Sequence, residues 1–233
     1  MRIHIKTIGV ALAASVAMTV QAAAQRPASV RDLPLIEAPA AANGSTLAIM
    51  LSGDGGWADI DKQIAAELSR NGVAVAGLDT RAYLRGRNRD ADQLARDLAR
   101  IADAYAAQWN RRDLAIVGYS RGADLAPFAI NRLPAEVRSR VRLVALIGLA
   151  RAANWHFHWI DVVKDVSRPD DVPTQPEVER LGDVPTLCIY GADEHESGCL
   201  DVPPAVHRIV RPGGHHLDGK FALVADSILA ALR

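Results

Sequence analysis

The chain has 233 residues, with 27 basic and 27 acidic side chains and a formal net charge of zero. A balanced charge gives no strongly basic surface to attract a polyanion, so the composition argues against nucleic-acid binding. The part that follows the N-terminal segment is long enough for one α/β domain with a full hydrophobic core.

The N-terminus has the three parts of a secretory signal peptide. Basic residues open the chain, an apolar run follows at Ile8–Val20, and small residues occur at Ala22–Ala24. The apolar run is too short to cross a bilayer, which takes about 20 residues. We therefore predict a signal peptide at residues 1–24 and a mature protein that begins at Gln25 in the periplasm.

The next segment, residues 25–43, is rich in Pro and Ala and is predicted to be a leader with one possible edge strand at Leu33–Glu37. Short apolar runs typical of buried strands then alternate with stretches whose apolar residues have helical spacing. The predicted strands are Thr46–Leu51, Val73–Leu78, Leu114–Val117, Val141–Leu149, Pro185–Tyr190 and Ala205–Val210, and the predicted helices are Asp59–Arg70, Ala91–Trp109, Ala123–Arg132 and Phe221–Leu232. Such alternation predicts an α/β domain at residues 44–233, with a mostly parallel sheet and helices on both faces.

Residues 151–184 interrupt this alternation. They contain three prolines and the aromatic residues Trp155, Phe157 and Trp159. We interpret the segment as an insertion or short cap over the carboxyl edge of the sheet, where folds of this class place their sites.

Gly118-Tyr119-Ser120-Arg121-Gly122 joins a predicted strand to a predicted helix. A G-x-S-x-G sequence on such a turn is the nucleophile elbow of α/β-hydrolases. The turn leaves no room for a Cβ on either side of the serine, and it raises the hydroxyl above the sheet. The pattern predicts an α/β-hydrolase fold with Ser120 as the nucleophile.

A serine nucleophile needs a base and an acid, which in this fold follow the serine in the order acid, then histidine. The acid is predicted within the loop after strand Pro185–Tyr190, where Glu194 is favoured by its spacing from the preceding glycine, Asp193 is the alternative and Glu196 is a more remote third candidate. His215, directly after Gly214, is the predicted base, with His216 as the alternative.

The Ser52–Trp57 loop, Ser-Gly-Asp-Gly-Gly-Trp, follows the first buried strand. In α/β-hydrolases a loop at this place supplies one oxyanion N–H, and the residue after the nucleophile supplies the other. We therefore predict the backbone N–H groups of Asp54 and Arg121 as donors. The loop glycines would also suit a phosphate nest, but no Lys-Ser/Thr follows as a P-loop requires. No cofactor is expected, nor a metal site, because His156 and His158 lack the further ligands that zinc needs.

Two cysteines, Cys188 and Cys199, lie close together in the part predicted to be exported. In an oxidising compartment an even pair at this spacing predicts a disulfide, although two buried thiols are the alternative. The bond would close the acidic loop that contains Glu194.

These motifs together resemble the bacterial AcvB/VirJ virulence-protein family. The resemblance covers residues 33–232 and rests on the Ser52–Trp57 loop, the Gly118–Ser120 turn, Gly122-Ala123-Asp124 and Gly213–His216. It implies a periplasmic α/β-hydrolase linked to hydrolysis of lysyl-phosphatidylglycerol and to type IV secretion. One difference from the family pattern is Arg121, where an apolar or aromatic residue is expected.

The resemblance implies an aminoacylated phospholipid as the substrate. Asp54 and Asp124 flank the predicted site and are expected to attract the ammonium group of the substrate. Trp57, in the same loop as Asp54, is a further predicted substrate-binding residue. Components of a type IV secretion system are possible partners. Two other functions remain open from the residues alone: a serine esterase for a soluble ester, and a non-catalytic periplasmic scaffold.

Overall fold

The structure, a computed structural model, describes residues 26–41, 43–86, 88–156 and 168–233. Its centre is a seven-stranded sheet with the strand order β1-β3-β2-β4-β5-β8-β9. The strands are β1 (Leu35–Ala38), β2 (Thr46–Leu51), β3 (Ala74–Leu78), β4 (Asp113–Tyr119), β5 (Val141–Ile147), β8 (Thr186–Gly191) and β9 (His207–Arg211). Only β1, at one edge, runs antiparallel to its neighbour; the other pairings in this sheet are parallel.

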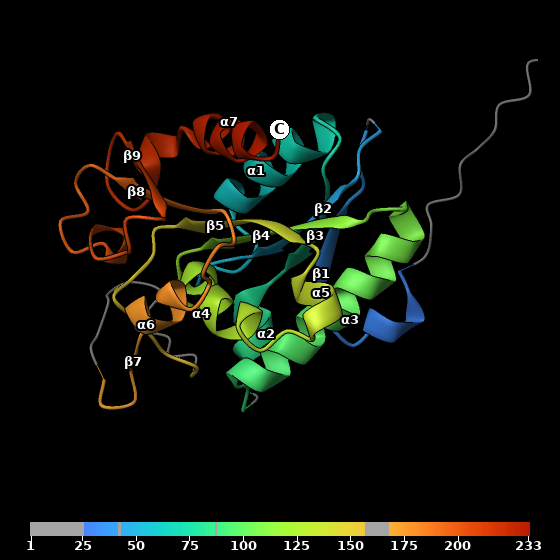
Figure 1. Cartoon of the computed structure of the whole chain (residues 1–233), viewed down its shortest axis with the longest axis horizontal. Coiled ribbons are helices and arrows are strands. Elements are labelled where there is room, and N and C mark those ends of the chain that lie inside the picture. Colours follow the sequence, from blue (N-terminus) through green and yellow to red (C-terminus); the bar gives the residue numbers. More distant parts are fainter. Residues whose placement is uncertain (1–25, 42, 87, 157–167) are drawn as a thin grey trace, which may run out of the picture.

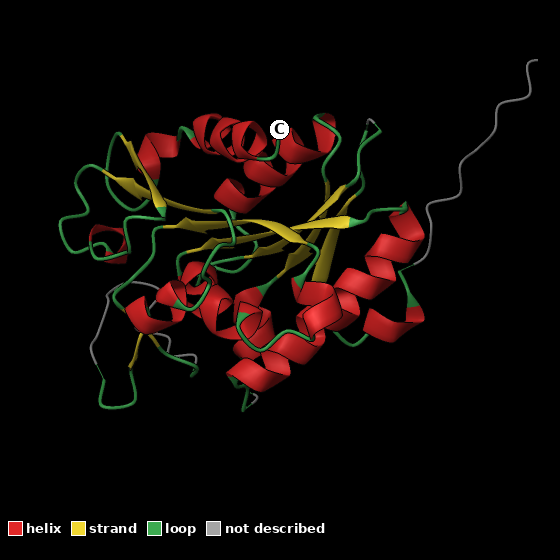
Figure 2. Cartoon of the chain, viewed as in Figure 1, coloured by secondary structure: helices red, strands yellow, loops and turns green. Residues whose placement is uncertain are grey.

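Helices cover both faces of the sheet (Figures 1 and 2). Helices α1 (Asp59–Arg70) and α7 (Phe221–Ala231) lie against each other on one face, and α3 (Ala91–Trp109) and α4 (Arg121–Ile130) lie on the other. The shorter helices are α2 (Thr80–Leu84), α5 (Ala135–Arg138) and α6 (Gln175–Glu179). None of the described helices has both the length and the apolar content needed to cross a bilayer.

The inner strands are mostly apolar because helices bury both of their faces, whereas the edge strand β9 is largely exposed. Along β2, Leu47, Ile49 and Leu51 belong to the core cluster under α3 and α4, whereas Ala48 and Met50 belong to the cluster under α1 and α7. This alternation follows from the period of two along a strand. The prediction of a parallel α/β sheet covered on both faces is confirmed.

The folded domain begins earlier than residue 44. Strand β1 pairs with β3 in the central sheet, and Val30, Leu33 and Leu35 are buried in the core. The Arg26 guanidinium also forms an ion pair with Glu37 at 3.0 Å. The possible edge strand predicted at Leu33–Glu37 is present as β1, and the segment predicted to be a leader is an integral edge of the domain.

The inserted segment forms a two-stranded hairpin and a short helix in its described part. Strand β6 (Ala152–Ala153) pairs antiparallel with β7 (Val172–Pro173), and α6 follows. The Thr174 hydroxyl donates to the carbonyl of Ala150 at 2.6 Å, which attaches the hairpin to the loop after β5. Phe157 and Trp159 lie outside the described residues, as does the predicted signal peptide.

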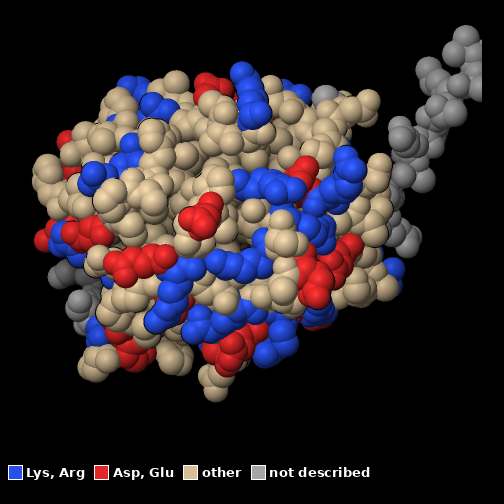
Figure 3. Space-filling model, in the orientation of Figure 1, with Lys and Arg blue, Asp and Glu red and all other residues tan. Residues whose placement is uncertain are grey.

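Charges of both signs lie side by side on the face of the molecule in Figure 3. Ion pairs such as Arg140 with Asp103 and Arg142 with Asp113, at 3.1 and 3.0 Å, keep opposite charges together. The field of such a surface is mixed rather than strongly positive or negative.

Asp61, in the first turn of α1, predicts a pH dependence of stability. One carboxyl oxygen accepts the N–H of Ala58 at 3.0 Å, whereas Oδ1 is buried with no hydrogen-bond partner among the described residues. Burial raises the pKa of Asp61 to about 7. The unfolded chain releases this proton near pH 4, so the folded protein binds it more tightly. The contribution of protonated Asp61 to the stability of the fold is therefore complete below pH 4 and is lost as the pH rises through 7.

Between pH 5.5 and 8.5, the free energy of unfolding of the wild type is expected to fall by on the order of 2 kcal/mol more than that of Asp61→Asn. Urea unfolding of both proteins at the two pH values measures this difference. If the free energy of unfolding changed equally with pH in both proteins, Asp61 would not be the cause, because the amide of the variant does not titrate.

Candidate active site

Ser120 occupies a strained turn between β4 and α4. Its φ of 51° and ψ of −122° lie in a region that residues with a Cβ rarely adopt. Backbone hydrogen bonds hold the turn: the Ser120 N–H donates to the carbonyl of Ile147 at 2.8 Å, and the Ala123 N–H donates to the carbonyl of Ser120 at 2.7 Å. This geometry is the sharp strand-to-helix turn of a nucleophile elbow.

The glycines on both sides of Ser120 are sterically required. A Cβ on Gly118 would collide with the backbone of Gly122, and a Cβ on Gly122 would collide with the carbonyl of Leu51 in β2. The close approach that the sequence predicted at both flanks is therefore confirmed, and α4 begins directly against the sheet.

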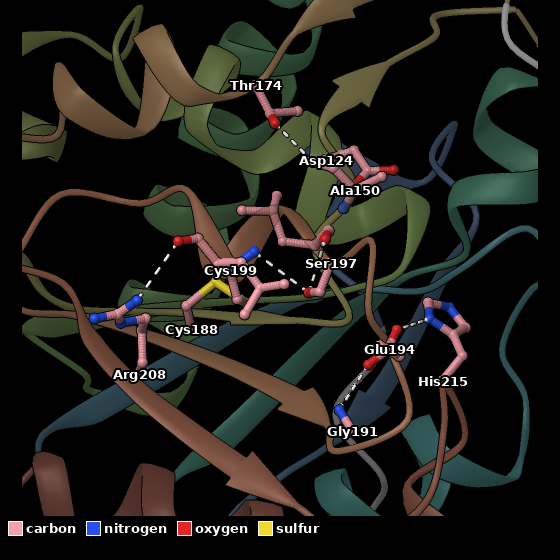
Figure 4. The surroundings of a disulfide bond; sticks show 12 residues. Asp124, Ala150, Thr174, Cys188, Gly191, Glu194, Ser197, Cys199, Arg208 and His215 are labelled. Atoms are coloured by element: carbon pink, nitrogen blue, oxygen red, sulfur yellow. Dashed lines mark hydrogen bonds and ion pairs between the residues drawn. A yellow bond between two sulfur atoms is a disulfide. The ribbon is translucent and has the colours of Figure 1, made fainter.

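His215 meets Glu194 at the carboxyl edge of the sheet (Figure 4). Nδ1 of His215 lies 2.7 Å from Oε1 of Glu194, and the Gly191 N–H donates to Oε2 at 2.6 Å. Asp193, the alternative acid, is an exposed residue of the same loop. The structure thus brings Glu194 and His215 together and leaves the Asp193 side chain on the surface.

Glu194 remains ionised in this environment. Its burial would raise the pKa, but hydrogen bonds from His215 and from the Gly191 N–H outweigh it and hold the pKa below its ordinary value. An ionised carboxylate can only accept, so Nδ1 of His215 carries the hydrogen and Nε2 is left to take a proton. This is the tautomer that a general base needs.

His216, the alternative base, contacts a different partner. Its Nδ1 lies 2.9 Å from the hydroxyl of Tyr119, the residue before the nucleophile. The Tyr119 and His215 rings are 5.4 Å apart between centroids. His216 is therefore placed beside the predicted base rather than in its position.

Ser120 and His215 line one cavity of about 350 Å³, together with Asp54, Arg121 and Asp124. A larger cavity, of about 680 Å³, lies at the amino ends of β5 and β8 and has none of these residues in its lining. Ligands of open parallel sheets bind at the carboxyl ends of the strands, so we place the site in the smaller cavity.

The chain is similar to proteins of known family and fold. A family model described as "Bacterial virulence protein (VirJ)" matches residues 45–233. This chain belongs to the VirJ family. A comparison with curated protein sequences found no match.

Solved α/β-hydrolase structures share the fold of this VirJ chain. MenH from S. aureus is 12% identical with a TM-score of 0.62, over 85% of this chain and 97% of that one. Naproxen esterase from Bacillus subtilis is 16% identical with a TM-score of 0.59, over 85% and 87%. The thioesterase domain from the curacin biosynthetic pathway is 14% identical with a TM-score of 0.55, over 84% and 94%. The predicted family and α/β-hydrolase fold are both confirmed.

Arg121, the residue at which this VirJ chain departs from the expected pattern, is paired with Asp54. Its Nε donates to both carboxylate oxygens of Asp54 at 3.2 Å, and one terminal nitrogen donates to the carbonyl of Asn154 at 2.6 Å. The Asp54 carboxylate, predicted to attract an ammonium group, is thus neutralised by a guanidinium.

Asp124 lines the same cavity and is 7% exposed. One of its oxygens accepts the N–H of Ala150 at 2.8 Å. Burial raises the pKa of Asp124 to about 7, against the smaller opposing effects of that hydrogen bond and of Arg121. The carboxyl of Asp124 therefore changes charge near neutral pH.

Two aromatic residues singled out by the sequence pack within the protein. The ring of Trp57 lies over Gly77 in β3, where a side chain on the glycine would collide with it. Trp57 is not among the residues that line the cavity, so the structure places it away from the predicted substrate. Trp155 packs edge-on against Phe128, with 6.0 Å between ring centroids.

Residues after β5 contribute to the site and were missed by the sequence reasoning. Gly148, with a φ of 63°, lies against the imidazole of His215, and a Cβ there would come within 2.7 Å of the ring. Ala150 binds Asp124, and Asn154 binds Arg121. A signal was available, because Gly148 lies at the end of the predicted strand Val141–Leu149, at the same sheet edge as Ser120.

A disulfide joins Cys188 in β8 to Cys199, and both residues are fully buried. Its loop contains Glu194, and Figure 4 shows the bond near the Glu194–His215 pair. Next to Cys199, the Gly198 N–H donates to the carbonyl of Leu149 at 2.7 Å. The bond therefore anchors the loop that presents the candidate acid.

Replacement of Cys188 and Cys199 by alanine is expected to lower stability by about 3 kcal/mol, because the open loop gains conformational entropy in the unfolded chain. Urea unfolding of the oxidised wild type and the double variant measures the loss. If reduction of the wild type left its unfolding midpoint unchanged, the bond would have no stabilising role.

Proposed function

We propose that this VirJ-family protein is a serine hydrolase that cleaves the aminoacyl ester of lysyl-phosphatidylglycerol. The proposal rests chiefly on the 2.7 Å contact between His215 and Glu194, at the edge of the cavity that also contains the elbow serine. An ionised acid, a histidine of defined tautomer and a serine on a strained turn are the parts of a serine-hydrolase triad.

The reaction follows from these positions in two halves. His215 removes the Ser120 proton while the serine oxygen attacks the aminoacyl carbonyl, and the N–H groups of Asp54 and Arg121 stabilise the oxyanion. Phosphatidylglycerol then leaves as an alcohol with the proton from His215. Water, deprotonated by the same histidine, attacks the aminoacyl-serine ester, and lysine is released with Ser120 restored.

The charges of the cavity support a substrate that carries both signs. Asp124 lies beside the elbow, and the cavity lining also includes Arg151 and Arg168. A lysyl ester has an ammonium group, and the headgroup that it esterifies has a phosphate. We assign the ammonium to Asp124 rather than Asp54, because Arg121 already neutralises Asp54. We assign the phosphate to Arg168 rather than Arg151, because Arg151 forms an ion pair with Asp201 at 2.7 Å.

We also propose a periplasmic location and contact with a membrane surface during turnover. The signal-like N-terminus supports export, and a buried disulfide suits an oxidising compartment. An interaction with type IV secretion components would follow from membership of the VirJ family and belongs to the same proposal.

Release of lysine from vesicles that contain lysyl-phosphatidylglycerol tests the substrate. The mature wild type is expected to release lysine and Ser120→Ala to release it at least about 10³-fold more slowly, with vesicles of unmodified phosphatidylglycerol as the blank. Cleavage of a soluble lysine ester without release from vesicles would favour the soluble-ester function, which the small polar cavity also suits. Failure to cleave either ester and to react with a fluorophosphonate would favour a scaffold.

Asp124 predicts how substrate preference changes with pH. The pKa of Asp124 is about 7, so its carboxylate becomes prevalent as the pH rises from 6 to 8, whereas the lysine side chain stays charged. The ratio of kcat/KM for lysyl to alanyl ester is expected to rise by up to about tenfold over this range. Asp124→Asn should show a low, pH-independent ratio; a ratio that still rises in this variant would overturn the assignment.

A further inference from the structure

Arg121 connects three segments of the site from a nearly buried position. The side chain is 7% exposed, and its partner Asp54 is 15% exposed. Its guanidinium binds both carboxylate oxygens of Asp54 in the Ser52–Trp57 loop and the carbonyl of Asn154 in the insertion. Asn154 is held in turn, because its Nδ2 donates to Oδ1 of Asp171 at 2.8 Å. A buried arginine with this set of acceptors has a defined position.

The two residues joined by this ion pair are those whose backbone N–H groups are assigned to the oxyanion. The Ser52–Trp57 loop also passes very close to the elbow, since a Cβ on Gly53 would lie 3.1 Å from the Cβ of Ser120. Oxyanion donors act at about 2.7 to 3.1 Å from the developing charge, so a small shift of the loop weakens their effect.

The ion pair also controls the charge next to the oxyanion. Without Arg121, the Asp54 carboxylate would put a negative charge on the residue whose N–H stabilises the oxyanion. Repulsion between these two negative charges would oppose the reaction. The Arg121 guanidinium cancels this charge. Loss of Arg121 therefore has two effects, a less constrained loop and an uncompensated carboxylate, whereas loss of both side chains has only the first.

We propose that the Arg121–Asp54 ion pair is a clamp that sets the position of the Ser52–Trp57 loop relative to the elbow and keeps the oxyanion site free of net negative charge. Both side chains are positioning residues, because they act through the backbone donors rather than on the substrate. This inference rests on the proposed serine-hydrolase function and adds to it a means of constructing the oxyanion site.

A double-mutant cycle with Arg121→Met, Asp54→Asn and their combination tests the clamp. With a soluble lysine ester, Arg121→Met is expected to lower kcat by about 100-fold and Asp54→Asn by about 10-fold, with KM changed less than about threefold. The combined variant should be no slower than Arg121→Met alone, because its loop carries no unpaired charge. Affinity for a boronate, which forms a tetrahedral adduct, should fall in parallel with kcat.

Arg121→Lys supplies the conservative control. The lysine ammonium restores the positive charge, but it cannot contact both oxygens of Asp54 and the carbonyl of Asn154 at the same time. Its kcat should lie between those of the wild type and Arg121→Met, with the pH profile of the base unchanged. If Arg121→Met fails to fold, Asp54→Asn and Arg121→Lys carry the test. If the wild type is active and the losses of kcat in the two single variants add up in the combined variant, the clamp is overturned. It is also overturned if the variants change KM and leave kcat unchanged. A wild type that cleaves no ester would overturn the proposed function and the clamp with it.

Discussion

Replacement of Ser120 by alanine is expected to reduce ester hydrolysis by at least about 10³-fold. The hydroxyl is the group that forms the covalent intermediate, and no other serine is described in the lining of this cavity. The residual rate would come from the oxyanion donors and from binding alone. Initial rates with a soluble lysine ester at pH 8 measure the loss.

The exposed residue Ser139 supplies the control for this prediction. Its hydroxyl donates to the carbonyl of Glu136 in the turn at the end of α5, at the edge of the sheet opposite the site. Ser139→Ala should therefore retain wild-type rates and wild-type labelling by a fluorophosphonate. Ester hydrolysis that survives in Ser120→Ala would refute the proposed mechanism as a whole.

Replacement of Glu194 by glutamine is expected to lower kcat by about 10³-fold. The carboxylate accepts one hydrogen bond from His215 and one from the Gly191 N–H. An amide has a single accepting oxygen, so glutamine cannot keep both bonds, and the imidazole loses its orientation or its tautomer. Steady-state kinetics above neutral pH measure the effect. The Glu194 carboxyl of the wild type is ionised there, because its pKa lies below its ordinary value.

The adjacent acid provides a matched control within the same loop. Asp193 is exposed, and Asp193→Asn removes one negative charge one residue away from Glu194. Its kcat should stay within about twofold of the wild type, because surface charges have small effects in water. A larger loss in Asp193→Asn than in Glu194→Gln would exchange the two assignments.

Local sequence patterns predicted most of the fold. Strand β2 and helices α1 and α3 have the same bounds in the structure as in the sequence prediction, because each has an uninterrupted apolar run or a regular helical stripe. The short helix α2 and the hairpin of β6 and β7 were missed. These elements have few residues, so periodicity is not expressed in them, and tertiary contacts support them instead.

The sequence favoured Glu194 and His215 over their neighbours, and the tertiary structure shows how these two side chains come into contact. Adjacent side chains in a loop point in different directions, and contacts with other segments decide which one faces the site. The loop that carries Glu194 passes so close to the loop of His215 that a Cβ on Gly191 would collide with the carbonyls of Gly213 and Gly214. This crossing directs Glu194 rather than Asp193 to the histidine.

The sequence by itself determined the class of this protein: a parallel α/β domain with an elbow serine, an acid and a histidine in hydrolase order, and the motifs of the VirJ family. These features are carried by residues that are near in sequence, so local steric and hydrophobic rules reveal them. Only the tertiary structure decided that Arg121 binds Asp54, that Trp57 packs on β3 and that the edge strand β1 pairs with β3. Each of these depends on segments distant in the chain, whose contacts arise when the sheet is assembled.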